Sequence, residues 1–168
     1  MKSREYDDIS RLLEGLEMVF RRQQKGLVID MFPSADDAQA WVDALAKSLR
    51  NDLLAPNGVK FDASFPVNAA VLGHVAGETS PVFKRVEVDP TQTPVDFAAT
   101  LAHELVHTGQ YEARPRMTNE EAHDAEFGAN LAKLGLLPPW TASEAGPAFK
   151  EWYRLHAPKP EEYGARTK

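Results

Sequence analysis

Cysteine is absent from the 168 residues of this chain. Its absence excludes disulfide bonds, thiol nucleophiles and zinc sites built on thiolates, so any metal site must use histidine and carboxylate ligands. Basic residues are outnumbered as well, because 19 Lys and Arg face 25 Asp and Glu and give a formal net charge of −6. This balance implies no broad phosphate-binding surface, so a nucleic-acid partner is not expected.

Long apolar runs are also missing, since no segment approaches the roughly 18 to 20 apolar residues that a bilayer span needs. The N-terminal segment MKSREYDDIS is charged where a secretory signal has an apolar core. We therefore expect a cytoplasmic protein without a membrane partner. The composition is ordinary for a globular protein, and we predict a single domain over residues 1–156 followed by a flexible, solvated tail at residues 157–168.

Apolar residues recur at three- and four-residue intervals in several segments, which predicts amphipathic helices. These helices are expected near residues 6–25, 34–55, 93–108, 119–134 and 149–156. Ser34, Thr93 and Asn119 are their predicted N-caps where a cap is recognisable. Short apolar or β-branched runs predict strands at residues 27–32, 59–61, 70–76 and 82–88, with residues 77–81 as a turn.

The helix that follows Thr93 contains the sequence HELVH at residues 103–107, which has the HExxH pattern. Four residues make about one helical turn, so His103 and His107 project from the same face and can hold one zinc ion. Glu104 points beside the metal, where its carboxylate can take a proton from a zinc-activated water. A separate apolar stripe along this helix is available for packing, and it consists of Phe97, Leu101 and Leu105.

A zinc site of this kind needs a third protein ligand, and the next predicted helix offers His123 near its N-terminal end. The competing ligands are Glu120 and, less favoured, Glu121 or Glu126. Tyr111 and Arg114 are chemically able to stabilise an oxyanion, although a solvent-facing position is equally compatible with their place in the sequence. Carboxylates that could accept a hydrogen bond from the imidazoles are Asp124, Glu120 and Glu112.

HELVH followed after a short loop by HDAEFGANLAKLGL resembles the SprT-like zinc metallopeptidases. Their pattern is HExxH, then a His with a Phe one turn later on a helix that ends in Leu-Gly, and the match covers roughly residues 82–137. The resemblance implies that His103, His107 and His123 bind Zn²⁺ and that Glu104 is the general base. It also implies a minimal zincin-like α+β domain, in which helices pack on a small β-sheet and a second ligand-bearing helix crosses the HExxH helix. The strand at residues 82–88 would be the edge along which an extended peptide substrate aligns.

The function expected from the sequence is therefore hydrolysis of peptide bonds by a zinc metallopeptidase. Many SprT-like proteins carry a cysteine-based zinc ribbon, which this chain lacks, and the acidic balance does not support a role on DNA. Three alternatives remain at the level of sequence. They are a gluzincin-type site with Glu120 as the third ligand, a zinc-binding regulatory or interaction module without proteolysis, and a helical scaffold without metal.

Overall fold

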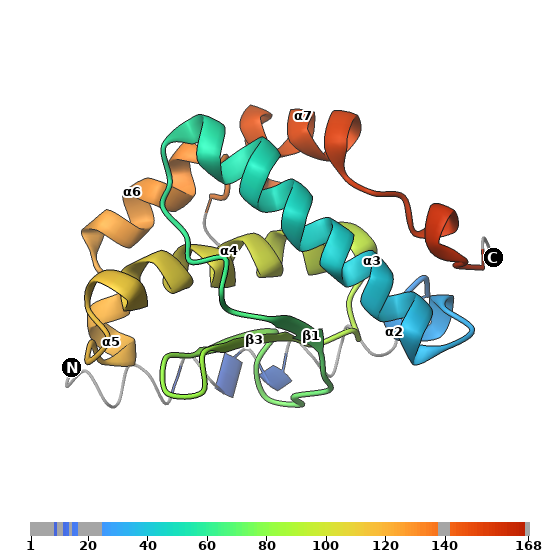
Figure 1. The fold of residues 1–168 in the computed structure, drawn as a ribbon, viewed down its shortest axis with the longest axis horizontal. Coiled ribbons are helices and arrows are strands. Elements are labelled where there is room, and N and C mark those ends of the chain that lie inside the picture. The colour runs from blue at the N-terminus through green and yellow to red at the C-terminus, as the bar shows by residue number, and fades with distance from the viewer. Residues whose placement is uncertain (1–8, 10–11, 14, 17–24, 138–141, 167–168) are drawn as a thin grey trace.

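The computed structural model describes residues 9, 12–13, 15–16, 25–137 and 142–166 of the chain, which has a mixed α+β architecture (Figure 1). The α-helices are α2 (Val28–Met31), α3 (Ala35–Ser48), α4 (Pro94–Ala113), α5 (Asn119–Ala122), α6 (Ala125–Lys133) and α7 (Pro147–His156). The structure also has a π-helical segment, η1 (Leu49–Leu54), and three 3-10 turns, which are η2 (Ala55–Asn57), η3 (Ala142–Glu144) and η4 (Pro160–Tyr163). The helix predicted near residues 6–25 lies largely outside the described residues.

The strands form one three-stranded sheet in the order β1-β3-β2, from β1 (Val67–Ala69), β2 (Gly77–Ser80) and β3 (Arg85–Val88). β1 runs parallel to β3, with Val67 opposite Val86, and β2 runs antiparallel to β3, with Thr79 opposite Val86. The central position of β3 corrects the prediction that residues 82–88 form the edge strand. The prediction of a turn at residues 77–81 was also wrong, because most of this segment is β2, and the turn falls at exposed Val82 and Phe83.

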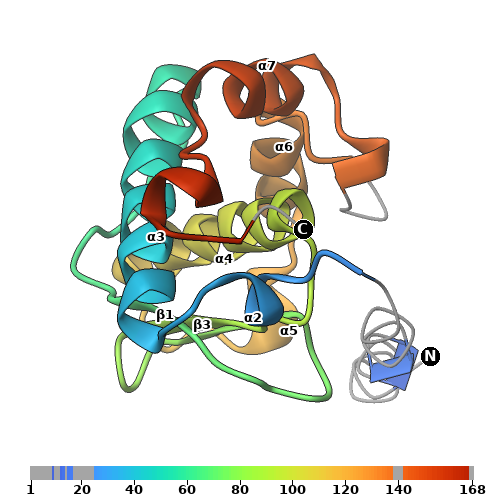
Figure 2. The same cartoon turned by 90° about the vertical axis from the view of Figure 1, so that its right-hand side faces the viewer.

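One face of the sheet is covered by α3 and α4, and α6 and α7 lie farther from the sheet beyond these two helices (Figures 1 and 2). The core forms between these layers, where Trp41 of α3 packs on Phe97 of α4 with ring centroids 5.3 Å apart. Both side chains are buried. Because burying a large apolar side chain contributes about 1.5 to 3 kcal/mol, such contacts account for the attachment of α4 to α3.

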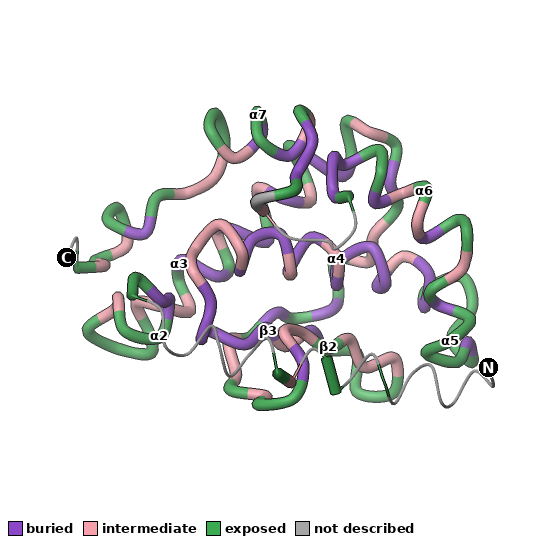
Figure 3. Tube along the Cα trace, turned by 180° about the vertical axis from the view of Figure 1, so that it is seen from behind, coloured by how far each residue is buried: buried purple, intermediate pink, exposed green. Residues whose placement is uncertain are grey.

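The two longest helices begin at the residues that the sequence indicates. The Ser34 hydroxyl accepts a hydrogen bond from the Asp37 backbone N–H at 3.1 Å, and the Thr93 hydroxyl accepts one from the Asp96 N–H at 3.4 Å. Such caps stabilise a helix by about 1 kcal/mol each. α4 continues past residue 108 to Ala113, and it is buried along most of its length (Figure 3).

Three other predicted strands do not form. Residues 59–61 and 70–76 are irregular, and residues 27–32 contain the single helical turn α2 instead of a buried strand. Leu27 and Val28 are buried as expected, but the backbone N–H groups of Val28 and Ile29 donate to the carbonyls of Gln92 and Pro90 at 2.8 and 2.9 Å. These two backbone N–H groups therefore bond to the loop before α4 and are not available to pair with a neighbouring strand.

The segment predicted as a solvated tail lies in part against the domain. The Trp41 indole N–H donates to the Pro158 carbonyl at 2.9 Å, and the Arg166 backbone N–H donates to the Met31 carbonyl at 2.8 Å. Pro160 is buried at the start of η4. Within the described ranges, no helix has both the length and the apolar character that crossing a membrane requires.

Candidate metal centre

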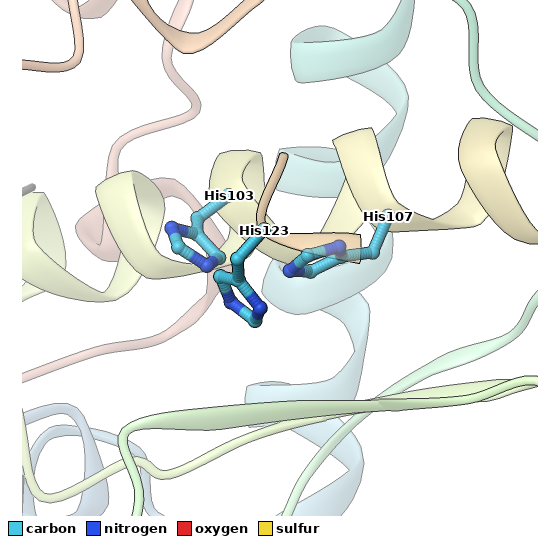
Figure 4. A group of neighbouring side chains, drawn as sticks. All are labelled: His103, His107 and His123. Carbon is cyan, nitrogen blue, oxygen red and sulfur yellow. The ribbon is translucent and has the colours of Figure 1, made fainter. Parts of the chain in front are cut away.

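α4 places His103 and His107 on the same face, one turn apart, as the HExxH spacing predicts. Their ring centroids are 5.1 Å apart (Figure 4). The predicted apolar stripe lies on another face and is completely buried, and it comprises Phe97, Leu101 and Leu105. Burial of this stripe fixes the rotation of α4 about its axis, so the two imidazoles are held on a different face of the helix.

The third histidine lies at a break between two helices, which the sequence pattern did not predict. The helix predicted over residues 119–134 is two helices, because α5 ends before His123 and α6 begins after Asp124. Thr118, rather than Asn119, caps α5 in a capping box with Glu121, and the Asp124 carboxylate accepts a hydrogen bond from the Phe127 N–H at 2.8 Å. His123 stands at the joint between them, with non-helical backbone angles of φ −101° and ψ 41°.

This joint turns the His123 side chain toward α4. The ring centroid of His123 lies 4.8 Å from that of His107 and 6.0 Å from that of His103. One potential ligand atom from each of the three imidazoles lies within 4.8 Å of the others. The structure therefore brings the three predicted ligands together, and in the described part of the chain this metal-compatible group contains no carboxylate.

The hydrogen bonds of two imidazoles determine which ring nitrogen faces the group. The Nδ1 atom of His123 lies 2.7 Å from the Asn119 backbone carbonyl, and the Nδ1 atom of His107 lies 2.7 Å from Gln110 Oε1. A carbonyl oxygen can only accept a hydrogen bond, so Nδ1 carries the proton of a neutral ring and Nε2 keeps its lone pair. The lone pair at Nε2 is the form that binds a metal ion.

Burial keeps two of the rings neutral. The pKa of His107 falls from its ordinary value near 6.5 to about 3, first because the ring is desolvated and second because His123 is close. The pKa of His103 is also well below its ordinary value, owing to burial and then to its two histidine neighbours. Neutral imidazole is the ligand form, so no deprotonation of these rings is needed near pH 7.

Phe127, the Phe one turn after His123 in the SprT-like pattern, contacts all three imidazoles. Its ring centroid lies 4.2 Å from that of His107, 4.9 Å from that of His103 and 5.2 Å from that of His123. The side chain is 3% exposed. A single aromatic ring thus forms the apolar base on which the three polar rings are arranged.

Glu104 lies beside this group and is held by the sheet. Its carboxylate Oε2 is 3.9 Å from His103 Nε2, and its Oε1 accepts a hydrogen bond from the Thr79 hydroxyl at 2.8 Å. β2 approaches α4 so closely that a Cβ atom on Gly77 would lie 2.8 Å from Thr100 Cγ2 and 3.0 Å from Glu104 Cγ. Glycine at position 77 therefore permits the contact that brings Thr79 to the carboxylate.

The other predicted site residues divide into two groups. Tyr111 is 7% exposed, one turn beyond His107, and its pKa is raised by burial and then by the charge of Glu104. Arg114 lies on the surface, where its guanidinium donates a hydrogen bond to the Asp124 carboxylate at 3.2 Å. The exposed carboxylates that do not join the three imidazoles are Glu112, Glu120, Glu121 and Glu126.

The acceptors that the structure gives to His107 and His123 are not the predicted carboxylates. They are the amide of Gln110 and the backbone carbonyl of Asn119. Gln110 could have been found in the sequence, because residues three apart on a helix are neighbours and an amide oxygen can accept from an imidazole. Thr79 could not, since its proximity to Glu104 depends on how β2 packs against α4.

Comparisons with family models, curated proteins and solved structures give no match to this chain. The functional assignment therefore depends on the geometry and chemistry of this site.

Proposed function

We propose that the chain is a zinc metallopeptidase with a zincin-like fold, in keeping with the SprT-like pattern of its sequence. The observation that carries the proposal is the convergence of three histidine ligand atoms within 4.8 Å of one another beside a buried glutamate. His103, His107 and His123 would hold the zinc ion. Glu104 would serve as the general base.

The donor set fits zinc. One known type of catalytic zinc site has three imidazole ligands and neither thiolate nor carboxylate. Its fourth position remains for water or substrate. The lone pairs of His107 and His123 at Nε2 are available because their Nδ1 atoms are hydrogen-bonded elsewhere. A zinc ion bound there supplies a Lewis acid that polarises a carbonyl and lowers the pKa of water from 15.7 to about 7.

Glu104 would transfer the proton of the attacking water. The Thr79 hydroxyl holds this carboxylate in place through Oε1, and Oε2 lies on the side of His103, so the carboxylate of Glu104 would accept the proton of the attacking water beside the metal. The same carboxylate then returns the proton to the leaving amine of the cleaved peptide. Tyr111 lies on the site side of α4 and is the candidate that the structure favours over Arg114 for stabilising the oxyanion.

The edge strand next to the site is β2, so the predicted peptide-binding strand is reassigned from residues 82–88 to Gly77–Ser80. An extended peptide would add to this edge through backbone hydrogen bonds, a common mode of peptide recognition. At the opposite edge, the Gln39 side chain donates to the Val67 carbonyl of β1 at 2.8 Å. That side-chain cap on β1, together with the position of Glu104 beside β2, favours β2 as the strand that aligns the substrate.

Cleavage of fluorescently labelled casein by the zinc-loaded protein tests this function, with Glu104→Gln as the decisive variant. We expect Glu104→Gln to retain zinc and to lose activity by about 10²- to 10⁴-fold, because the amide cannot accept the proton. Glu112→Gln is the matched control, an exposed glutamate on the same helix, and it should cleave like the wild type. Wild-type cleavage by Glu104→Gln would contradict the proposal, and zinc binding without hydrolysis would favour a zinc-binding interaction module instead.

A further inference from the structure

We propose that Gln110 is a positioning residue, which selects the orientation of the His107 imidazole that directs Nε2 toward zinc. The inference deepens the proposed function and rests on its metal site. It concerns a side chain that does not touch the metal or the substrate. Gln110 acts only through its hydrogen bond to His107.

The geometry leaves two orientations of the His107 ring, and Gln110 distinguishes them. Phe127 is stacked on His107 and fixes the plane of the imidazole. A half-turn about the Cβ–Cγ bond preserves this plane but exchanges Nδ1 with a ring carbon and Nε2 with the other ring carbon. Only one orientation places an N–H against Gln110 Oε1, at a nitrogen to oxygen distance of 2.7 Å. In that orientation the other ring nitrogen, Nε2, points toward the other two imidazoles (Figure 4).

The side-chain amide nitrogen of Gln110 indicates that the residue serves His107 rather than packing. Its Nε2 atom is buried and has no hydrogen-bond partner among the residues that the structure describes. A buried donor without a partner destabilises the folded state, and methionine could fill similar space without that penalty. Packing therefore does not account for an amide at this position, whereas the hydrogen bond from His107 to its oxygen does.

The direction of that hydrogen bond follows from the role of His107. If the Gln110 amide were reversed, its N–H would donate to Nδ1, and the proton of a neutral imidazole would sit on Nε2. A protonated Nε2 cannot bind a metal ion. An acceptor at position 110 therefore favours metal binding through Nε2, and glutamine and glutamate supply a strong acceptor, whereas the thioether of methionine is a weak one.

The test compares the full-length wild type with Gln110→Met and Gln110→Glu. The Zn²⁺ affinity is measured by competition with a chromophoric chelator, and the melting temperature is measured on the metal-free proteins. We expect Gln110→Met to bind Zn²⁺ about 10- to 100-fold more weakly, the usual effect of losing a hydrogen-bond partner of a ligand. Its metal-free melting temperature should stay close to that of the wild type, because the loss of the hydrogen bond to His107 is offset by removal of the unpaired amide N–H. Gln110→Glu should bind Zn²⁺ at least as tightly as the wild type.

Gln39→Met is the matched control, because the Gln39 amide is hydrogen-bonded to Asp43 and Val67 outside the site. Its Zn²⁺ affinity should equal that of the wild type. The inference is overturned if Gln110→Met keeps the wild-type affinity, or if Gln110→Met and Gln110→Glu weaken binding alike. Failure to bind Zn²⁺ in the wild type would overturn this inference and the proposed function together. Zn²⁺ binding without casein cleavage would contradict only the proposed function.

Discussion

Phe127 is stacked on His107, with ring centroids 4.2 Å apart and ring planes inclined by only 9°. The contact joins α6 to α4 at the metal centre, so the helix that follows His123 also supports a ligand of the preceding helix. Since a ring in such a stack cannot rotate out of plane without displacing its partner, the orientation of His107 depends on the position of α6.

Replacement of Phe127 by leucine removes this flat support but keeps an apolar side chain. We expect the free energy of unfolding to fall by about 1 to 3 kcal/mol and the Zn²⁺ affinity to fall as well, because the imidazoles lose their shared contact. Phe149→Leu is the matched control, since Phe149 is equally buried but belongs to α7. Chemical denaturation and chelator competition measure the two effects, and equal Zn²⁺ affinities in the two variants would exclude a role of Phe127 at the site.

The hydrogen bond from Thr79 to Glu104 leads to a prediction about catalysis without metal loss. Thr79→Val preserves the shape of the side chain but removes the hydroxyl that holds Glu104 Oε1 at 2.8 Å. We expect a fall of about 10- to 100-fold in kcat for casein cleavage, with one zinc per chain retained. Thr79→Ser restores the hydroxyl and should recover most of the activity. Full activity in the valine variant would show that Glu104 needs no such support.

The low pKa values of His103 and His107 predict acid sensitivity of the metal-free protein. In the unfolded chain these imidazoles take up protons below about pH 6.5, whereas folded His107 does so only near pH 3. Between these values the unfolded state binds more protons, so the free energy of unfolding decreases as the pH falls from 6.5 toward 3. Each such imidazole contributes a slope of up to about 1.4 kcal/mol per pH unit.

The measurement is the free energy of unfolding of the metal-free protein between pH 7 and pH 4. His107→Leu should show a shallower slope than the wild type, because one buried imidazole no longer resists protonation. His156→Leu serves as the control, since His156 is exposed at the end of α7, and it should keep the wild-type slope. A slope unaffected by His107→Leu would mean that this ring titrates alike in the folded and unfolded states.

The part of the site that follows from local sequence was predictable. On α4, Thr93 marks the start of the helix, and the apolar stripe and the two histidines each repeat with the helical period. One local pattern therefore determines the face on which each residue lies. The break at His123 also had local signals, namely the capping box of Thr118 and Glu121 and the cap at Asp124. The spacing of Phe127, Leu131 and Leu134 predicts a helix but not the residue at which it begins, so only the caps locate the break.

The sheet was less predictable because its strands are specified by distant partners. β2 has the sequence Gly-Glu-Thr-Ser, which lacks the alternation of apolar and polar residues typical of a half-buried strand. It forms because it pairs with β3 and packs against α4 through Gly77. Residues 27–32 show the converse, since an apolar run predicts burial but not the backbone geometry, which here depends on the carbonyls of Pro90 and Gln92.

The most direct test of the three-histidine zinc centre is the zinc content of the purified full-length protein, measured by elemental analysis beside three variants. We expect one zinc per chain in the wild type, loss of zinc in His107→Ala and His123→Ala, and retention in Glu120→Gln, whose carboxylate is exposed. Full zinc occupancy in His123→Ala with loss in Glu120→Gln would assign the third ligand to Glu120. Absence of zinc from the wild type after gentle purification and incubation with Zn²⁺ would contradict the metal centre itself.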